Sequence, residues 1–174
     1  MREDARSAAA RRAAITAQIQ ADTGVNEPML ERLIRGFYMR VRNDDVLGPI
    51  FAAKIDDWEP HLQKMFAFWS SVALMSGHYH GQPMAKHLPL PIDARHFDRW
   101  LTLFADTARD VCPPAAAERF TLLSHRVGES LELGIANAHG VLLNKGQRYF
   151  EESGKSALGR ACDLAGDNQG TDAL

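Results

Sequence analysis

Large apolar residues recur at intervals of three and four between residues 26 and 138, and no stretch there alternates apolar and polar residues as a β-strand does. Such intervals place side chains on one face of an α-helix. The first of these faces holds Met29, Leu33, Phe37 and Val41, with Leu30, Ile34 and Tyr38 beside it. Because a helix buries an apolar face by packing on another helix, the pattern predicts an all-α fold.

Capping and turn-forming residues divide this region into about five helices. Asn26 and Asp93 are suitable N-caps, and prolines at 83 and 89 allow little more than one or two helical turns between them. The predicted helices run from 26 to about 42, from 56 or 57 to about 76, between 83 and 89, from 93 to 111, and from 113–117 to about 138. Residues 48–51 are predicted to form a tight turn.

The chain of 174 residues has the length of one domain with two extensions. Residues 1–25 form an N-terminal extension, in which residues 1–20 are expected to be a polar helix without a committed apolar face. Residues 26–140 form the domain itself. Residues 141–174 form a C-terminal extension rich in Gly, Asp, Asn and Ser, which we expect to be partly disordered.

Composition excludes several classes of protein. Apolar residues make up 45% of the chain and charged residues 24%, which is typical of a globular protein. A net charge of -2 and a pI near 6.4 argue against nucleic-acid binding. No apolar run is long enough to span a membrane, and the N-terminus lacks the apolar block of a signal peptide, so we expect a cytoplasmic protein. Cys112 and Cys162 lie far apart and indicate neither a disulfide framework nor a thiolate metal site.

Four side chains able to do chemistry fall on the apolar faces. Tyr38 lies on the first helix, His61 on the second and Trp100 on the fourth, while His87 lies in the short segment braced by prolines. Two histidines facing one apolar space can approach a flat metal cofactor from both sides, and a phenol and an indole can hydrogen-bond what the metal holds. These are the residue types of a haem pocket.

Other metal or nucleotide sites have weaker support. Structural zinc requires four ligands at short spacings, and hydrolytic zinc favours HExxH, and neither pattern occurs among the seven histidines. The sequence also has no P-loop, no GxGxxG and no GxSxG. His78 and His80 lie in a turn bounded by glycines and are expected to face water.

Four runs of residues in this order carry a family resemblance: FYMRVRNDDVLGPIF, DDWEPHLQKMFAFW, YHGQPMAKHLPLP and HFDRWLTLF. Within them VRxDxxLGPIF and GQPxxKHLxLP are the most specific. The region from about Asn26 to Ala138 resembles the group III truncated haemoglobins, which are bacterial globins. The resemblance implies a two-over-two helical sandwich with a short proximal helix and with haem b, iron protoporphyrin IX, as its cofactor.

The resemblance also implies a role for each candidate residue. His87 would be the proximal iron ligand, Tyr38 and Trp100 the polar groups on the distal side, and His61 the distal histidine or gate. The remaining candidates, Phe51, Phe68 and Trp69, would contact the porphyrin, and Lys64 would meet a haem propionate.

The implied function is reversible binding of O2, NO, CO or peroxide at an iron with one open position. If Tyr38 and Trp100 both donate hydrogen bonds, ligand release should be slow, which favours redox detoxification, as an NO dioxygenase or a peroxidase-like enzyme, supported by a separate reductase. An oxygen storage or transfer protein is the alternative within this family, and a gas sensor is a weaker one. Outside the family, the alternative is a helical interaction module without a cofactor.

Overall fold

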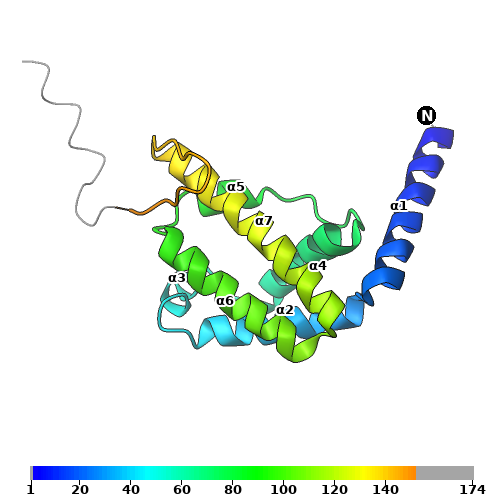
Figure 1. Ribbon diagram of the computed structural model, residues 1–174, viewed down its shortest axis with the longest axis horizontal. Helices are drawn as coiled ribbons and strands as arrows, with labels where there is room; N and C mark the ends of the chain where they lie inside the picture. The colour runs from blue at the N-terminus through cyan, green and yellow to red at the C-terminus, as the bar shows by residue number, and fades with distance from the viewer. Residues whose placement is uncertain (1, 152–174) are drawn as a thin grey trace, which may run out of the picture.

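The computed structural model describes residues 2–151, with side chains from residue 7 onward, and this part of the chain consists of α-helices and connecting segments without strands (Figure 1). The helices are α1 (Arg2–Thr23), α2 (Glu27–Arg42), α3 (Gly48–Ala52), α4 (Trp58–Leu74), α5 (Pro83–His87), α6 (Ala94–Val111) and α7 (Pro114–Ala138). The all-α prediction is confirmed. Most of the predicted C-terminal extension lies outside the described residues.

Two pairs of helices form the sandwich. Helix α2 packs on α4 and α6, while α7 packs on α6 and α4, so the pair α2–α4 lies against the pair α6–α7. The short helix α5 contacts α7. Helix α1 projects from the remainder of the molecule (Figure 1), and its second half is anchored where the Thr16 hydroxyl donates to the carbonyl of Leu74 at 2.6 Å.

Local capping explains where the two best predicted helices begin. The Asn26 side chain accepts the backbone N–H of Met29 at 2.9 Å, and the helix that follows buries a broad apolar face. Asp93 caps α6 in a capping box with His96. The core formed by these helices contains fully buried Leu30, Phe37, Trp69, Phe104 and Phe120.

Residues 48–51 differ from the prediction, because they belong to helix α3 and not to a simple turn. The Asp44 carboxylate accepts the backbone N–H groups of Val46 and Leu47 at 3.0 and 2.9 Å and orders the chain just before this helix. A Cβ at Gly48 would lie 3.1 Å from the carbonyl oxygen of Arg42, so α3 packs closely on the end of α2. Phe51, on α3, is half-buried.

No helix within residues 2–151 combines the length and the hydropathy that a membrane span would need.

Candidate functional site

Helix α4 carries His61 into the interior. Its first turn is capped by Asp57, whose carboxylate accepts the backbone N–H of Glu59 at 3.2 Å. His61 lies one turn further on, and its Nε2 atom is buried without a hydrogen-bond partner among the described residues. Buried polar atoms in native proteins nearly always have a hydrogen-bond partner. The unpaired Nε2 of His61 therefore indicates a position where a bound ligand supplies the missing contact.

Burial lowers the pKa of His61, and the positive charge of Lys64 one turn later lowers it further. The imidazole is therefore neutral near pH 7.

Three further aromatic side chains surround His61. Tyr38, Phe51 and Trp58 have ring centroids 5.1, 6.4 and 5.8 Å from the imidazole, all with edge-to-face geometry. Tyr38 is only 5% exposed, and burial raises the pKa of its phenol, so the hydroxyl remains a protonated donor. We call Tyr38, Phe51, Trp58 and His61 the aromatic cluster.

Trp100 reaches the same region from α6. Its ring stacks on Phe104 and on Trp69, with centroid distances of 5.4 and 6.4 Å, and its edge meets Phe37, which in turn contacts Tyr38. Trp100 is half-buried, whereas Trp69 is 1% exposed and packs inside the core. The two predicted donors, Tyr38 and Trp100, are thus linked through one phenylalanine.

His87 is the last residue of α5. Its Nδ1 atom lies 2.7 Å from the carbonyl oxygen of Pro83, and because a carbonyl can only accept, Nδ1 donates. In the neutral ring, Nε2 then keeps a free lone pair, which is the form that binds a metal ion. Met84 packs α5 against α7 so tightly that a Cβ at Gly134 would overlap its Sδ and Cε atoms.

Two other predicted site residues, Phe68 and Lys64, lie outside the aromatic cluster. Phe68 lies away from the aromatic cluster and packs edge to face against Tyr79 at 5.3 Å. Lys64 is exposed one turn after His61, and His78 and His80 are exposed as expected.

Trp58 was not among the predicted site residues, although it precedes His61 by three positions on the same helix face. The guanidinium of Arg42 covers its ring at 4.9 Å. Helical spacing alone could have identified Trp58, but nothing in the sequence indicated Arg42.

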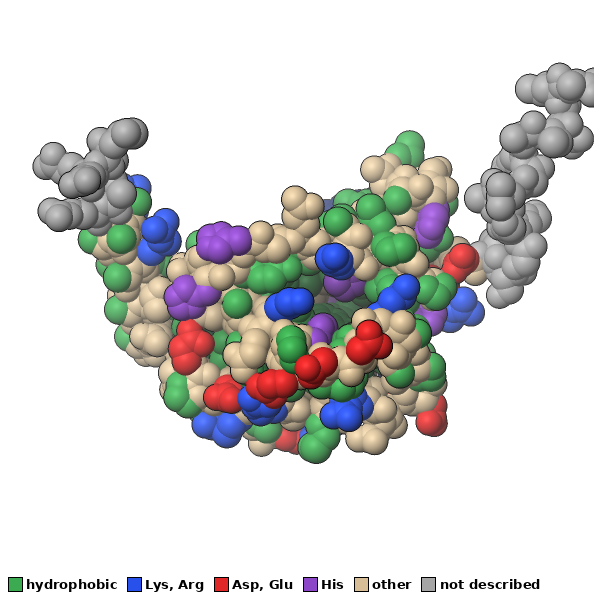
Figure 2. Space-filling model, turned by 180° about the vertical axis from the view of Figure 1, so that it is seen from behind, with side chains coloured by type: hydrophobic (Ala, Val, Ile, Leu, Met, Phe, Trp, Pro, Cys, Tyr) green, Lys and Arg blue, Asp and Glu red, His purple; other side chains and the backbone are tan. Residues whose placement is uncertain are grey.

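A hollow lies on the face of the molecule shown in Figure 2, with apolar side chains inside it, histidines within and beside it, and charged side chains of both signs around the rim. Many large apolar side chains of α4 and α6 are only half-buried against the core, among them Leu62, Met65, Phe66, Trp100 and Leu103. An apolar hollow with histidines within and beside it suits a flat, mostly apolar metal cofactor.

The two packed helix pairs and the apolar hollow beside them fit an all-helical protein of the globin class. The sequence model of the bacterial-like globin family matches residues 22–125 of the chain. The chain therefore belongs to the bacterial-like globins, and among them to the group III truncated haemoglobins, which bind haem and small gas molecules.

Two curated relatives are similar to the chain. Group 3 truncated haemoglobin ctb of Campylobacter jejuni is 39% identical over 88 residues, which are 48% of this chain and 69% of the relative. Group 2 truncated haemoglobin YjbI of Bacillus subtilis is 30% identical over 84 residues, which are 47% of this chain and 64% of the relative.

Two solved structures share the fold. The crystal structure of the group III truncated haemoglobin from Campylobacter jejuni matches with a TM-score of 0.59 and 31% identity, covering 62% of this chain and 88% of that one. The truncated oxygen-avid haemoglobin from Bacillus subtilis matches with a TM-score of 0.51 and 26% identity, covering 62% and 94%. The two-over-two fold predicted from the sequence is confirmed.

Proposed function

We propose that the chain binds haem b with His87 as the single protein ligand of the iron. The proposal rests on the hydrogen bonding of two imidazoles: His87 has Nδ1 bonded to Pro83, which leaves Nε2 available, and the buried Nε2 of His61 has no partner among the described residues. Both nitrogens fit a metal cofactor between α4 and α5. The sequence contains no C-x-x-C-H run for covalent attachment, which favours haem b.

The side chains around the cofactor have distinct roles in this proposal. Tyr38 donates its hydroxyl hydrogen, and Trp100 its indole N–H, to a polar ligand in the pocket. His61 controls entry, because a neutral imidazole on the pocket side can swing outward to admit a ligand. Phe51 and Phe68, which are half-buried, supply apolar contacts around the porphyrin, and Lys64, exposed at the rim, pairs with a propionate. The sequence also assigned Trp69 to the porphyrin, but it is 1% exposed and supports Trp100 from within the core instead.

Haem iron held by one imidazole supplies an open position at which O2, NO, CO or peroxide can bind and react. Tyr38 and Trp100 then hold a polarised ligand in place, because hydrogen bonds to polarised or charged acceptors are strong in a dry, apolar setting. Slow release suits a reaction on the ligand better than delivery of it. We therefore propose redox detoxification of NO or peroxide as the function, with electrons from a separate reductase and a cytoplasmic location.

Oxygen storage or transfer is the second candidate. It is favoured if Trp100, which is already stacked on Trp69 and Phe104, keeps its N–H turned away from the ligand. The two functions differ in the O2 dissociation rate and in turnover of peroxide or NO: storage requires fast release and little turnover.

Absorption spectra of the reduced, oxidised and CO-bound protein test the cofactor assignment, and His87→Ala tests the ligand. We expect His87→Ala to lose haem or bind it weakly. His80→Ala is the matched control, because it changes an exposed histidine seven positions away and should leave the spectra unchanged. Stoichiometric haem with unaltered spectra in His87→Ala would contradict the assignment.

A further inference from the structure

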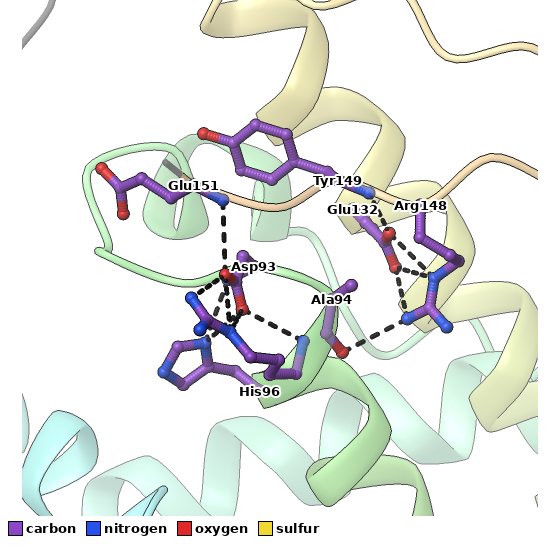
Figure 3. A network of polar contacts seen from close by, with 8 residues as sticks. Asp93, Ala94, His96, Glu132, Arg148, Tyr149 and Glu151 are labelled. Carbon is purple, nitrogen blue, oxygen red and sulfur yellow. Dashed lines mark hydrogen bonds and ion pairs between the residues drawn. The ribbon is translucent and has the colours of Figure 1, made fainter. Parts of the chain in front are cut away.

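The residues that follow α7 turn back across the molecule. We call residues 141–151 the C-terminal strap. It has no regular secondary structure, yet the Tyr149 side chain in it is only 5% exposed, whereas the next residue, Phe150, is 56% exposed. Figure 3 shows the end of the strap lying between α7 and the beginning of α6.

The strap completes the N-terminus of α6. The backbone N–H of Ala94, which has no partner within its own helix, donates to the carbonyl of Tyr149 at 2.7 Å. The N–H of Glu151 donates to the carboxylate of Asp93, the N-cap residue, at 3.3 Å. Asp93 is 1% exposed, so the carboxylate that accepts from Glu151 is itself buried. The strap thereby fixes the point at which the segment after His87 enters α6.

The same strap residues are tied to α7. The buried carboxylate of Glu132 accepts the N–H of Tyr149 at 2.8 Å and the guanidinium of Arg148 at 2.9 and 3.0 Å (Figure 3). Arg148 also donates to Asp98 on α6 at 2.8 Å. One arginine therefore links carboxylates on two helices, and charge-assisted bonds of this kind are strong when one partner is buried.

An apolar cluster and two backbone hydrogen bonds connect the strap to His87. The ring of Tyr149 belongs to a buried cluster with Ile92, Phe97, Ile135 and Ala136, and Leu90 packs against this cluster. The N–H of Ile92 donates to the carbonyl of Leu90 at 2.9 Å, and the N–H of Leu90 donates to the carbonyl of His87 at 3.0 Å. An unbroken series of apolar contacts and hydrogen bonds thus connects Tyr149 to His87.

Helix α5 requires such support. The bond from His87 to Pro83 orients the imidazole relative to α5. The helix itself has only five residues, no side-chain N-cap and no buried residue, so its position depends on the parts of the chain that pack around it. We propose that the C-terminal strap positions His87 as an iron ligand, with Tyr149 and Arg148 as its positioning residues. This inference rests on the proposed role of His87, and it places residues 141–151 within the functional domain.

The test compares Tyr149→Ala with Phe150→Ala in the full, haem-loaded chain. Two quantities are measured: the rate of haem transfer to excess apomyoglobin, and the iron–histidine stretching band in the resonance Raman spectrum of the reduced protein. We expect Tyr149→Ala to release haem about tenfold faster, in the range found for groups that orient metal ligands, and to shift or broaden the band. Phe150→Ala should match the wild type in both.

Two further variants separate positioning from loss of folding. Tyr149→Phe keeps the buried ring and both backbone bonds, and loses only the bond between the hydroxyl and Nδ1 of His139, so it should keep the wild-type band. Arg148→Gln should change the band in the direction of Tyr149→Ala, and it serves as the deciding variant if Tyr149→Ala does not fold. A wild-type band in Arg148→Gln, or equal haem release from Tyr149→Ala and Phe150→Ala, would overturn the inference. Absence of an iron–histidine band in the wild type would instead refute the role of His87.

Discussion

Replacement of Tyr38 by Phe isolates one hydroxyl group in the pocket. The ring of Tyr38 packs against Phe37, Phe51 and His61 at centroid distances of 5.0, 5.9 and 5.1 Å, and a phenylalanine keeps all three contacts. Because the raised pKa keeps the hydroxyl protonated, the variant loses one hydrogen-bond donor and little else. A bond from such a donor to a strongly polarised ligand contributes roughly 1.5–3 kcal/mol, so O2 dissociation should become about 10 to 100 times faster.

Carbon monoxide provides the control, because bound CO is far less polar than bound O2 and should be released at nearly the wild-type rate. The assay is stopped-flow displacement of each gas from wild type and Tyr38→Phe, reported as the ratio of the two dissociation rates. Trp100→Phe should also speed O2 release, although it additionally removes part of the stack with Trp69. If the dissociation rates of O2 and CO rise by the same factor in Tyr38→Phe, the hydroxyl acts through its size and not through a hydrogen bond, and the electrostatic account of the pocket is refuted.

Three other predictions concern His61, the packing of α5 on α7, and the ion pair that precedes α3. Burial lowers the pKa of His61, so the neutral, inward-facing ring is favoured at neutral pH. This preference is lost as the pH falls below the ordinary histidine pKa of about 6.5, because the protonated ring is more stable in water. The rate of CO association after flash photolysis should therefore rise on acidification in the wild type and should not depend on pH in His61→Leu. Gly134→Ala forces the flexible end of Met84 to move and should lower the free energy of unfolding in urea by about 1 kcal/mol, whereas an unchanged or higher free energy of unfolding would contradict the close packing of Met84 on α7. Asp44→Asn weakens the ion pair with Arg99, whose nitrogen lies 2.6 Å from the carboxylate, and should lower the free energy of unfolding by about 1–3 kcal/mol, whereas an unchanged urea midpoint would show that the pair is dispensable.

The helices could be predicted from the sequence because their signals are local. Asn26 and Asp93 cap helices through backbone groups two or three residues away, and the spacing of apolar residues defines the buried faces. Tyr38 and His61 could be selected for the same reason, since polar-tipped residues on apolar faces are visible in the sequence. Their contact, at 5.1 Å between helices, follows once α2 packs on α4.

What the sequence did not predict depends on contacts between distant residues. Helix α3 follows an Asp44 carboxylate that also pairs with Arg99, 55 positions later in the chain. Trp58 gains its significance from Arg42, which covers it from the end of another helix. The bond between Arg148 and Asp98 joins residues 50 positions apart. Such pairs have no periodicity, so a single sequence gives no reason to choose one partner over another.

The two sides of the pocket are therefore stabilised in different ways. On the side of α4, aromatic rings from three helices pack around His61, and burial of these rings orders that side of the pocket. On the side of α5, the helix is too short to order itself, and His87 depends on Met84 against α7 and on the strap beyond residue 140. A change in the strap should thus alter the position of His87, the proposed iron ligand, while leaving the aromatic cluster intact. Under this proposal the residues after α7 adjust the chemistry of the pocket without contacting the bound gas.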